Sequence, residues 1–220
     1  MPILTVRWLR IAALVTLPWL LASGLGCTPF VPRYDYEIEP DPTRMEYVIG
    51  PGDIIDIRQW KNPDVSGRGR VLPGGNISVP LLGQIQAAGL TARALREKLS
   101  KGLEKYIAQN ADMPTLTVAV DEFQSYTVSI VGEVSQPGHY QPGHYVSVLD
   151  ALGLAHGLSP YAKGEQMFIL RRTATEQRKI PISYPALLTG KHPEMNLHLL
   201  RGDVLEAGVD GVVTLRARVV

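Results

Sequence analysis

Glycine and proline recur along the whole chain, and this limits how long any helix or strand can be. The 220 residues include 21 glycines and 17 prolines, which are spread throughout the sequence. Both residues favour tight turns, and both are more frequent here than in an average chain. The sequence therefore predicts short strands joined by turns, with helix as the minor component.

The first ordered stretch, 47–122, alternates in the way that strands do and contains one clear helical pattern. We expect strands over 54–60, 69–72, 76–79, 84–88 and 115–121. The second and third of these should pair as a hairpin around a Pro-Gly-Gly turn. Thr91 can cap a helix whose apolar face includes Tyr106 and extends to Ile107. The stretch is predicted to be one α+β unit.

The second stretch, 123–220, is predicted to be another α+β unit. Strands are expected over 127–131, 167–172, 178–182 and 202–207, and a short helix or turn over 184–190. Ser147 and Asp150 form a capping box that begins a further short helix, and Gly157 can end it in the left-handed conformation. A strand, a short helix over the sheet and further strands are compatible with a β-grasp-like module.

The N-terminus has the pattern of a secretory signal peptide over 1–26. Arg7 and Arg10 precede an apolar core that small residues follow. The uncharged stretch is shorter than the roughly 20 residues that span a bilayer, and Pro18 interrupts it. We expect cleavage after this segment, and the alternative is a signal anchor that stays in the membrane.

Cys27, the single cysteine, directly follows this segment and has no internal disulfide partner. Its surroundings resemble the lipobox of bacterial lipoproteins, in which the thiol is acylated, although Gly24 replaces the usual large aliphatic residue. Thr28 stands where an aspartate would resemble an inner-membrane retention signal. We therefore expect a lipid anchor of the palmitate kind in the outer membrane, facing the periplasm. The alternative is a free or intermolecularly paired thiol.

The segment 27–46 is rich in proline and has no sustained periodicity. It predicts an extended, lipidated tether between the anchor and the folded part. In the alternative, its aromatic residues dock on the fold.

The charge balance excludes nucleic acid as a partner, and no residue pattern indicates a cofactor. The chain has 22 basic and 21 acidic side chains, without the clustered positive charge that nucleic acid requires. No catalytic residue is expected, because Asp53 and Asp56 lie on one strand rather than opposed as a glycosidase pair. Asp53 should instead bond amides of its own Gly-Pro-Gly turn. The Arg-Gly-Asp tripeptide at 201–203 is predicted to be a turn before a strand.

A duplicated pentapeptide, QPGHYQPGHY, occupies 136–145. One interpretation is a saccharide-contacting loop, in which Tyr140 and Tyr145 stack on sugar C–H faces while His139 and His144 form hydrogen bonds. The other is a β-hairpin whose Pro-Gly turns happen to repeat. No metal site is expected, because the two histidines lack a supporting cluster of cysteine or carboxylate ligands.

Several segments, taken in order, resemble the polysaccharide export domain of the Wza-type outer-membrane export lipoproteins. They are YVIGPGDIIDI, VLPGGNISVPLLGQIQAAGLT and PTLTV. The later segments VSIVGEVSQPGHY, SVLDALGLAHGLSPYA, MFILRR and LLRGDVLEAG resemble the soluble-ligand-binding (SLBB) β-grasp domain that follows it in that family. His156 stands where the family commonly has a glycine. The matched structural motif residues are Gly50, Gly52, Asp53, Gly132 and Gly138.

The resemblance implies a homo-oligomeric ring in the periplasm that guides a polysaccharide and works with an inner-membrane polysaccharide co-polymerase. Such a protein binds rather than catalyses. The chain ends in VVTLRARVV, a strand pattern too short for a spanning helix. We therefore expect a short member that passes the polymer to another protein, for example an outer-membrane β-barrel, or that acts where a separate route exists. The first alternative is a lipoprotein that binds a soluble glycan or other ligand through its β-grasp domain. The second is a periplasmic glycan-modifying enzyme.

Overall fold

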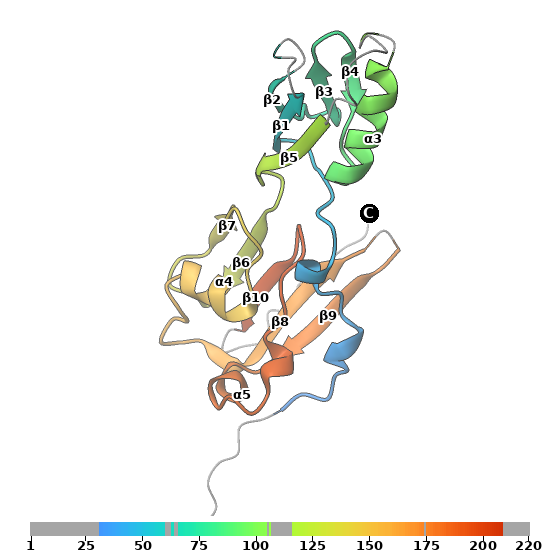
Figure 1. Ribbon diagram of the computed structural model, residues 1–220. Helices are drawn as coiled ribbons and strands as arrows, with labels where there is room; N and C mark the ends of the chain where they lie inside the picture. The colour runs from blue at the N-terminus through green and yellow to red at the C-terminus, as the bar shows by residue number, and fades with distance from the viewer. Residues whose placement is uncertain are drawn as a thin grey trace, which may run out of the picture. The chain divides into compact units, whose positions relative to one another are not determined.

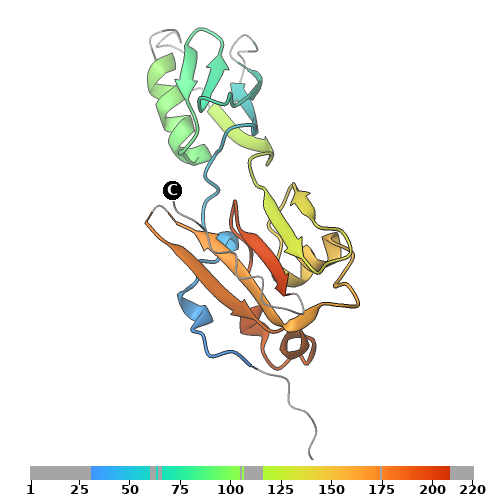
Figure 2. The ribbon, with the colours of Figure 1, turned by 180° about the vertical axis from the view of Figure 1, so that it is seen from behind.

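The computed structural model describes residues 31–59, 63, 66–104, 106, 116–173 and 175–208. These residues form two lobes, and each lobe combines β-sheet and α-helix around its own hydrophobic core (Figures 1 and 2). The α+β fold class predicted from the sequence is confirmed.

The first lobe combines a three-stranded antiparallel sheet, a hairpin and one helix. The sheet has the order β2-β1-β5, and the hairpin pairs β3 with β4. The elements are β1 (Ile54–Gln59), β2 (Gly67–Arg70), β3 (Asn76–Val79), β4 (Gly83–Gln86), α3 (Ala92–Leu103) and β5 (Leu116–Glu122). Ile55, Ile57 and Ile77 are buried in its core.

The hairpin predicted across 73–76 is wrong in its pairing, although the turn is present. The Leu72 amide donates to the Asn76 carbonyl at 2.8 Å. The strands on the two sides of this turn nevertheless pair elsewhere, because β2 lies on β1 and β3 pairs with β4. The short turn between β3 and β4, where Leu81 and Gly83 have positive φ angles, closes the more local hairpin.

Helix α3 begins as predicted and ends earlier. The Thr91 hydroxyl accepts a hydrogen bond from the Ala94 amide, and Leu95, Leu99 and Leu103 are fully buried. Tyr106, expected on the same apolar face, is 58% exposed. The buried face therefore stops with the helix at Leu103, because Tyr106 lies beyond its last turn.

The second lobe is built on a five-stranded mixed sheet in the order β7-β6-β10-β8-β9. Only β6 and β10 pair in parallel. A first hairpin, then a helix, then strands that end beside the first one is the β-grasp-like order that the sequence suggested. The elements are β6 (Val128–Gly132), β7 (Gly138–Tyr140), α4 (Val148–Leu154), β8 (Lys163–Arg172), β9 (Gln177–Ile182), α5 (Tyr184–Leu188) and β10 (Val204–Gly208).

Both ends of α4 follow the sequence prediction. Ser147 and Asp150 form the capping box at its start. Beyond its end, Gly157 has a φ of +83° and His156 a φ of +60°. The backbone at His156 thus has the left-handed conformation that glycine adopts without strain, which explains why a glycine suits this position.

The described part of the predicted tether, residues 31–46, is docked on the second lobe. It contains the short 3-10 helices η1 (Tyr36–Ile38) and η2 (Pro42–Arg44). Tyr36 is 7% exposed within the second core, and its hydroxyl donates to the Pro181 carbonyl of β9 at 2.7 Å. Figures 1 and 2 both show this segment, in blue, beside β9. The prediction of an extended tether is therefore wrong for residues 31–46. The alternative, in which aromatic residues dock on the fold, is the one observed, because burial of Tyr36 and its hydrogen bond hold the segment there.

Candidate functional site

Each lobe has one Gly-Asp turn directly before a central strand, and the two turns have similar geometry. Asp53 precedes β1, and its Oδ2 accepts a hydrogen bond from the Gly50 amide at 2.8 Å. Asp203 precedes β10, and its Oδ2 accepts one from the Leu200 amide, also at 2.8 Å. The glycine before each aspartate has a positive φ. The structure thus confirms the predicted bond from Asp53 to its own turn and the predicted turn at 201–203.

The Asp53 carboxylate also binds the segment that joins the lobes. Its Oδ1 accepts from the Ser125 amide at 2.7 Å, and its Oδ2 accepts from the Tyr47 hydroxyl at 2.8 Å. Asp53 is fully buried, and burying a carboxylate is costly unless hydrogen bonds compensate it. These donors supply that compensation, so the carboxylate fixes Ser125 and Tyr47 around the first turn.

Two of the predicted motif glycines have a clear steric reason. A Cβ at Gly50 would collide with Arg201 Nη1 and Ser125 Oγ, and a Cβ at Gly132 would collide with the Ala207 carbonyl of β10. Gly138 differs, because its Cβ would meet only an ordinary contact with Tyr140 at 3.8 Å. Close approach therefore accounts for Gly50 and Gly132 but not for Gly138.

Arg201 brings the two turns into contact. Its Nη2 donates to the Val48 carbonyl, and the guanidinium carbon lies 5.4 Å from the centre of the Tyr47 ring. This distance is within the range of a cation-π interaction. The second Gly-Asp turn therefore contacts the chain just before the first one through a single exposed arginine.

Four aromatic rings continue from this contact. Tyr47 meets Phe123 edge to face at 4.6 Å between ring centres, and Tyr126 meets Tyr145 in the same way at 5.2 Å. Tyr47 and Tyr145 lie 6.4 Å apart and link the two pairs. We call Tyr47, Phe123, Tyr126 and Tyr145 the aromatic junction. The pKa of Tyr47 is raised to about 12, mainly by burial, and burial also raises the pKa of Tyr145.

Two cavities open on the aromatic junction. One, of about 170 Å³, is lined by all four rings together with Gly143 and His144. The other, of about 310 Å³, shares Tyr47, Tyr126 and Tyr145 with the first and extends to Arg201. Aromatic rings thus line both cavities, and the larger cavity also has the cationic side chain of Arg201.

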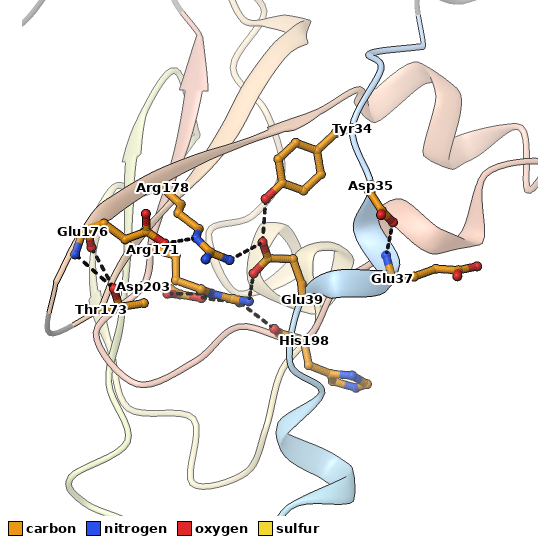
Figure 3. Close-up of polar contacts among 10 residues, drawn as sticks. All are labelled: Tyr34, Asp35, Glu37, Glu39, Arg171, Thr173, Glu176, Arg178, His198 and Asp203. Atoms are coloured by element: carbon orange, nitrogen blue, oxygen red, sulfur yellow. Dashed lines mark hydrogen bonds and ion pairs between the residues drawn. The ribbon is translucent and has the colours of Figure 1, made fainter.

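A buried ion network holds the N-terminal segment to the second lobe (Figure 3). Arg171 binds Asp203 through Nε and Nη2, the latter at 2.7 Å, and its Nη1 donates to Glu39 at 2.9 Å. Tyr34 donates to the other oxygen of Glu39 at 2.5 Å. Burial is the main cause that raises the pKa of Tyr34 to about 12. No local sequence pattern indicates this network.

The two copies of the repeated pentapeptide have different structures. The first forms β7, where His139 Nδ1 lies 2.8 Å from Ser129 Oγ and the Tyr140 hydroxyl donates to the Gln136 carbonyl. The second is a loop in which His144 and Tyr145 line the smaller cavity. The hairpin interpretation therefore holds for the first copy only. Saccharide contact by the four predicted side chains stays a prediction.

Several sequence predictions lie outside the described residues. They include the signal peptide over 1–26, lipidation of Cys27 and the C-terminal strand pattern. Within the described ranges, no helix is long and apolar enough to cross a membrane. The same residues contain no group of three or more histidine, cysteine, aspartate or glutamate side chains that could hold a metal ion.

Fold and site define a two-lobed α+β protein whose lobes meet at an aromatic junction. Residues 41–121, which include the first Gly-Asp turn and all of α3, match the family of polysaccharide biosynthesis/export proteins. These residues therefore match a domain of that family, as the resemblance in the sequence predicted.

Known proteins with similar sequences have names that refer to the export, transport or production of polysaccharides. EPS I polysaccharide export outer membrane protein EpsA of Ralstonia nicotianae is 27% identical over 183 residues, which cover 72% of this chain and 46% of that protein. Polysialic acid transport protein KpsD of Escherichia coli is 27% identical over 66% of this chain and 25% of its own length. Exopolysaccharide production protein ExoF of Rhizobium meliloti is 28% identical, over 55% and 30% respectively. This chain thus spans less than half of the length of each of these three relatives.

Proposed function

We propose that this protein is a periplasm-facing component of exopolysaccharide or capsule export, held at the outer membrane by a lipid and guiding the polymer without modifying it. The observation that carries the proposal is the match to the polysaccharide biosynthesis/export family over 41–121, together with similarity to one polysaccharide export protein over 72% of the chain. An inner-membrane polysaccharide co-polymerase is the partner that would supply the polymer.

The docked N-terminal segment bears on how the protein would sit at the membrane. If Cys27 carries the lipid, seven residue steps separate it from Tyr34, which packs against the core of the second lobe. Even fully extended, this stretch reaches only roughly 25 Å. The second lobe would then lie at the inner surface of the outer membrane rather than far from it.

The proposal includes assembly into a ring, because guiding a polymer requires a surface that surrounds it. The test is the mass of the purified mature chain in detergent, measured by light scattering, with the particles viewed by electron microscopy. A closed ring of many copies is expected. A strict monomer at high concentration would count against the ring and favour the second candidate, a lipoprotein that binds a soluble ligand. The aromatic cavities described above are the observation that keeps this second candidate open.

A further inference from the structure

The larger cavity at the aromatic junction combines exposed apolar surface with one cation. Met45 and Val48 line it and are 58% and 43% exposed. Tyr47 and Tyr145 form the aromatic part of its wall, and Arg201 lies at the same cavity. Rings with their faces or edges open to a hollow contact the C–H groups of a ligand, and their hydroxyls add polar contacts.

The charge of Arg201 is the unusual element. In the described part of the chain, its guanidinium contacts the Val48 carbonyl and the Tyr47 ring, and no carboxylate pairs with it. Burial raises the pKa of both Tyr47 and Tyr145, and the charge of Arg201 opposes that rise at both rings of the wall. A guanidinium has five N–H donors, and most of those on Arg201 have no bond among the described residues.

The carboxylates near Arg201 already have partners. Asp53 binds the Gly50 and Ser125 amides and the Tyr47 hydroxyl. Asp203, two residues along the chain, binds Arg171. Glu46, which lines the same cavity, forms an ion pair with Arg93. Among the described residues, these carboxylates are therefore not available to Arg201, which can bind an anion from outside the chain.

We propose that the aromatic junction binds an acidic saccharide, with a sugar ring against Tyr145 and its carboxylate on Arg201. The inference rests on the proposed role in polysaccharide export and names the chemical class of its ligand at one site. Stacking requires the apolar face that a pyranose presents through its C–H groups. A carboxylate on the same sugar matches the fork of a guanidinium, which binds it through two parallel hydrogen bonds. An acidic sugar offers both the apolar ring face and the carboxylate, whereas a neutral sugar offers only the ring face.

The test is a titration of the purified mature chain in detergent with an oligogalacturonate and with a neutral glucose oligosaccharide of the same length. Saturable binding of the acidic probe is expected, with the neutral probe weaker by about tenfold or more, since a charged hydrogen-bond pair contributes that much. Arg201→Gln should remove the preference for the acidic probe, and Tyr145→Ala should weaken both probes. Arg96→Gln and Tyr161→Ala are matched controls, because both residues are exposed and neither lines the cavity. Both controls should bind as the parent chain does.

Several outcomes would overturn the proposal. They are no saturable binding of the acidic probe, equal binding of the two probes, or binding that Arg201→Gln and Tyr145→Ala leave unchanged. A change in oligomer mass with Tyr145→Ala, without any loss of sugar binding, would instead assign the cavity to contact with a second copy. Melting curves of each variant separate loss of the site from loss of the fold.

Complementation of a deletion strain separates this inference from the proposed function. If deletion leaves polymer secretion intact, the proposed function fails. If deletion stops secretion and the double variant Arg201→Gln, Tyr145→Ala restores it fully, only the saccharide site fails. Partial or no restoration by this variant, with full restoration by Arg96→Gln, Tyr161→Ala, is the expected result.

Discussion

Arg171 Nη2 lies 2.7 Å from Asp203 Oδ2, and the side chains of both residues are only 2% exposed. The same guanidinium binds Glu39 of the N-terminal segment at 2.9 Å. One buried cation thus connects a carboxylate at the start of β10 with a carboxylate that lies in the segment leading from the proposed anchor. This connection holds residues 31–46 on the second lobe together with the buried Tyr36.

We predict that Arg171→Met destabilises the chain by about 3–5 kcal/mol, because it leaves two buried carboxylates without their cation. Urea unfolding of the purified protein measures the loss. Arg172→Met is the control, since Arg172 is the next residue of β8 and is exposed. Equal stability of the two variants would contradict the structural role assigned to Arg171.

Gly132→Ala should destabilise the second lobe by several kcal/mol, because its Cβ would collide with the Ala207 carbonyl and the φ there is +86°. Gly153→Ala is the matched control. Gly153 lies inside α4 with open space around its Cβ position, so the change should stabilise the helix by about 1 kcal/mol. Thermal unfolding of both variants checks the pair, and a harmless Gly132→Ala would be inconsistent with the parallel contact of β6 and β10.

Stability should fall as the pH rises above 10. Burial raises the pKa of Tyr47 to about 12 from its ordinary value of 10.0, and it does the same for Tyr34 and Tyr36. The unfolded chain therefore loses these phenolic protons at a lower pH than the folded chain does. The stabilisation is complete below pH 10 and is lost as the pH approaches 12.

The tyrosinate absorbance, followed together with circular dichroism, tests this dependence. Tyr47→Phe should reduce the alkaline loss and lower stability at neutral pH by about 1 kcal/mol, because it removes the hydroxyl that binds Asp53. Tyr161→Phe, at a 78% exposed position, should change neither quantity. A Tyr47→Phe variant with the full alkaline loss would show that this phenol is not responsible.

Cys27→Ser should leave unprocessed precursor or release the chain from the membrane. The reason is that each buried methylene of an acyl chain contributes roughly 0.8 kcal/mol, so several chains hold a protein at a bilayer. Mass spectrometry of the mature N-terminus and membrane fractionation measure the two effects. Unchanged outer-membrane retention, with no added lipid mass on the parent chain, would be evidence against the anchor.

Local sequence patterns predicted the elements better than they predicted the contacts between them. Met167, Ile169 and Arg171 alternate along β8 on one buried face, so period-two alternation alone could have placed Arg171 inside. Its partner Glu39 lies 132 residues away in sequence, and no local pattern indicates such a pairing. The contact of Arg201 with Tyr47 was missed for the same reason, because it depends on where the two turns lie in the fold.

The hairpin error has a related cause. The residues Pro-Gly-Gly correctly predict a turn, but a turn does not by itself decide which strands pair. Strand β1 pairs with β2 on one side and β5 on the other, and this partner choice depends on the burial of Ile55 and Ile57. The residues of the aromatic junction come from three separate stretches, so only the folded chain brings them together.

Polymer secretion by cells that lack this protein tests the central claim most directly. In the native host, deletion of the gene followed by separate measurement of polymer in the medium and in the periplasm should show secretion lost and polymer retained inside. The parent chain, supplied from a plasmid, should restore secretion. Undiminished polymer in the medium of the deletion strain would contradict a role in polysaccharide export.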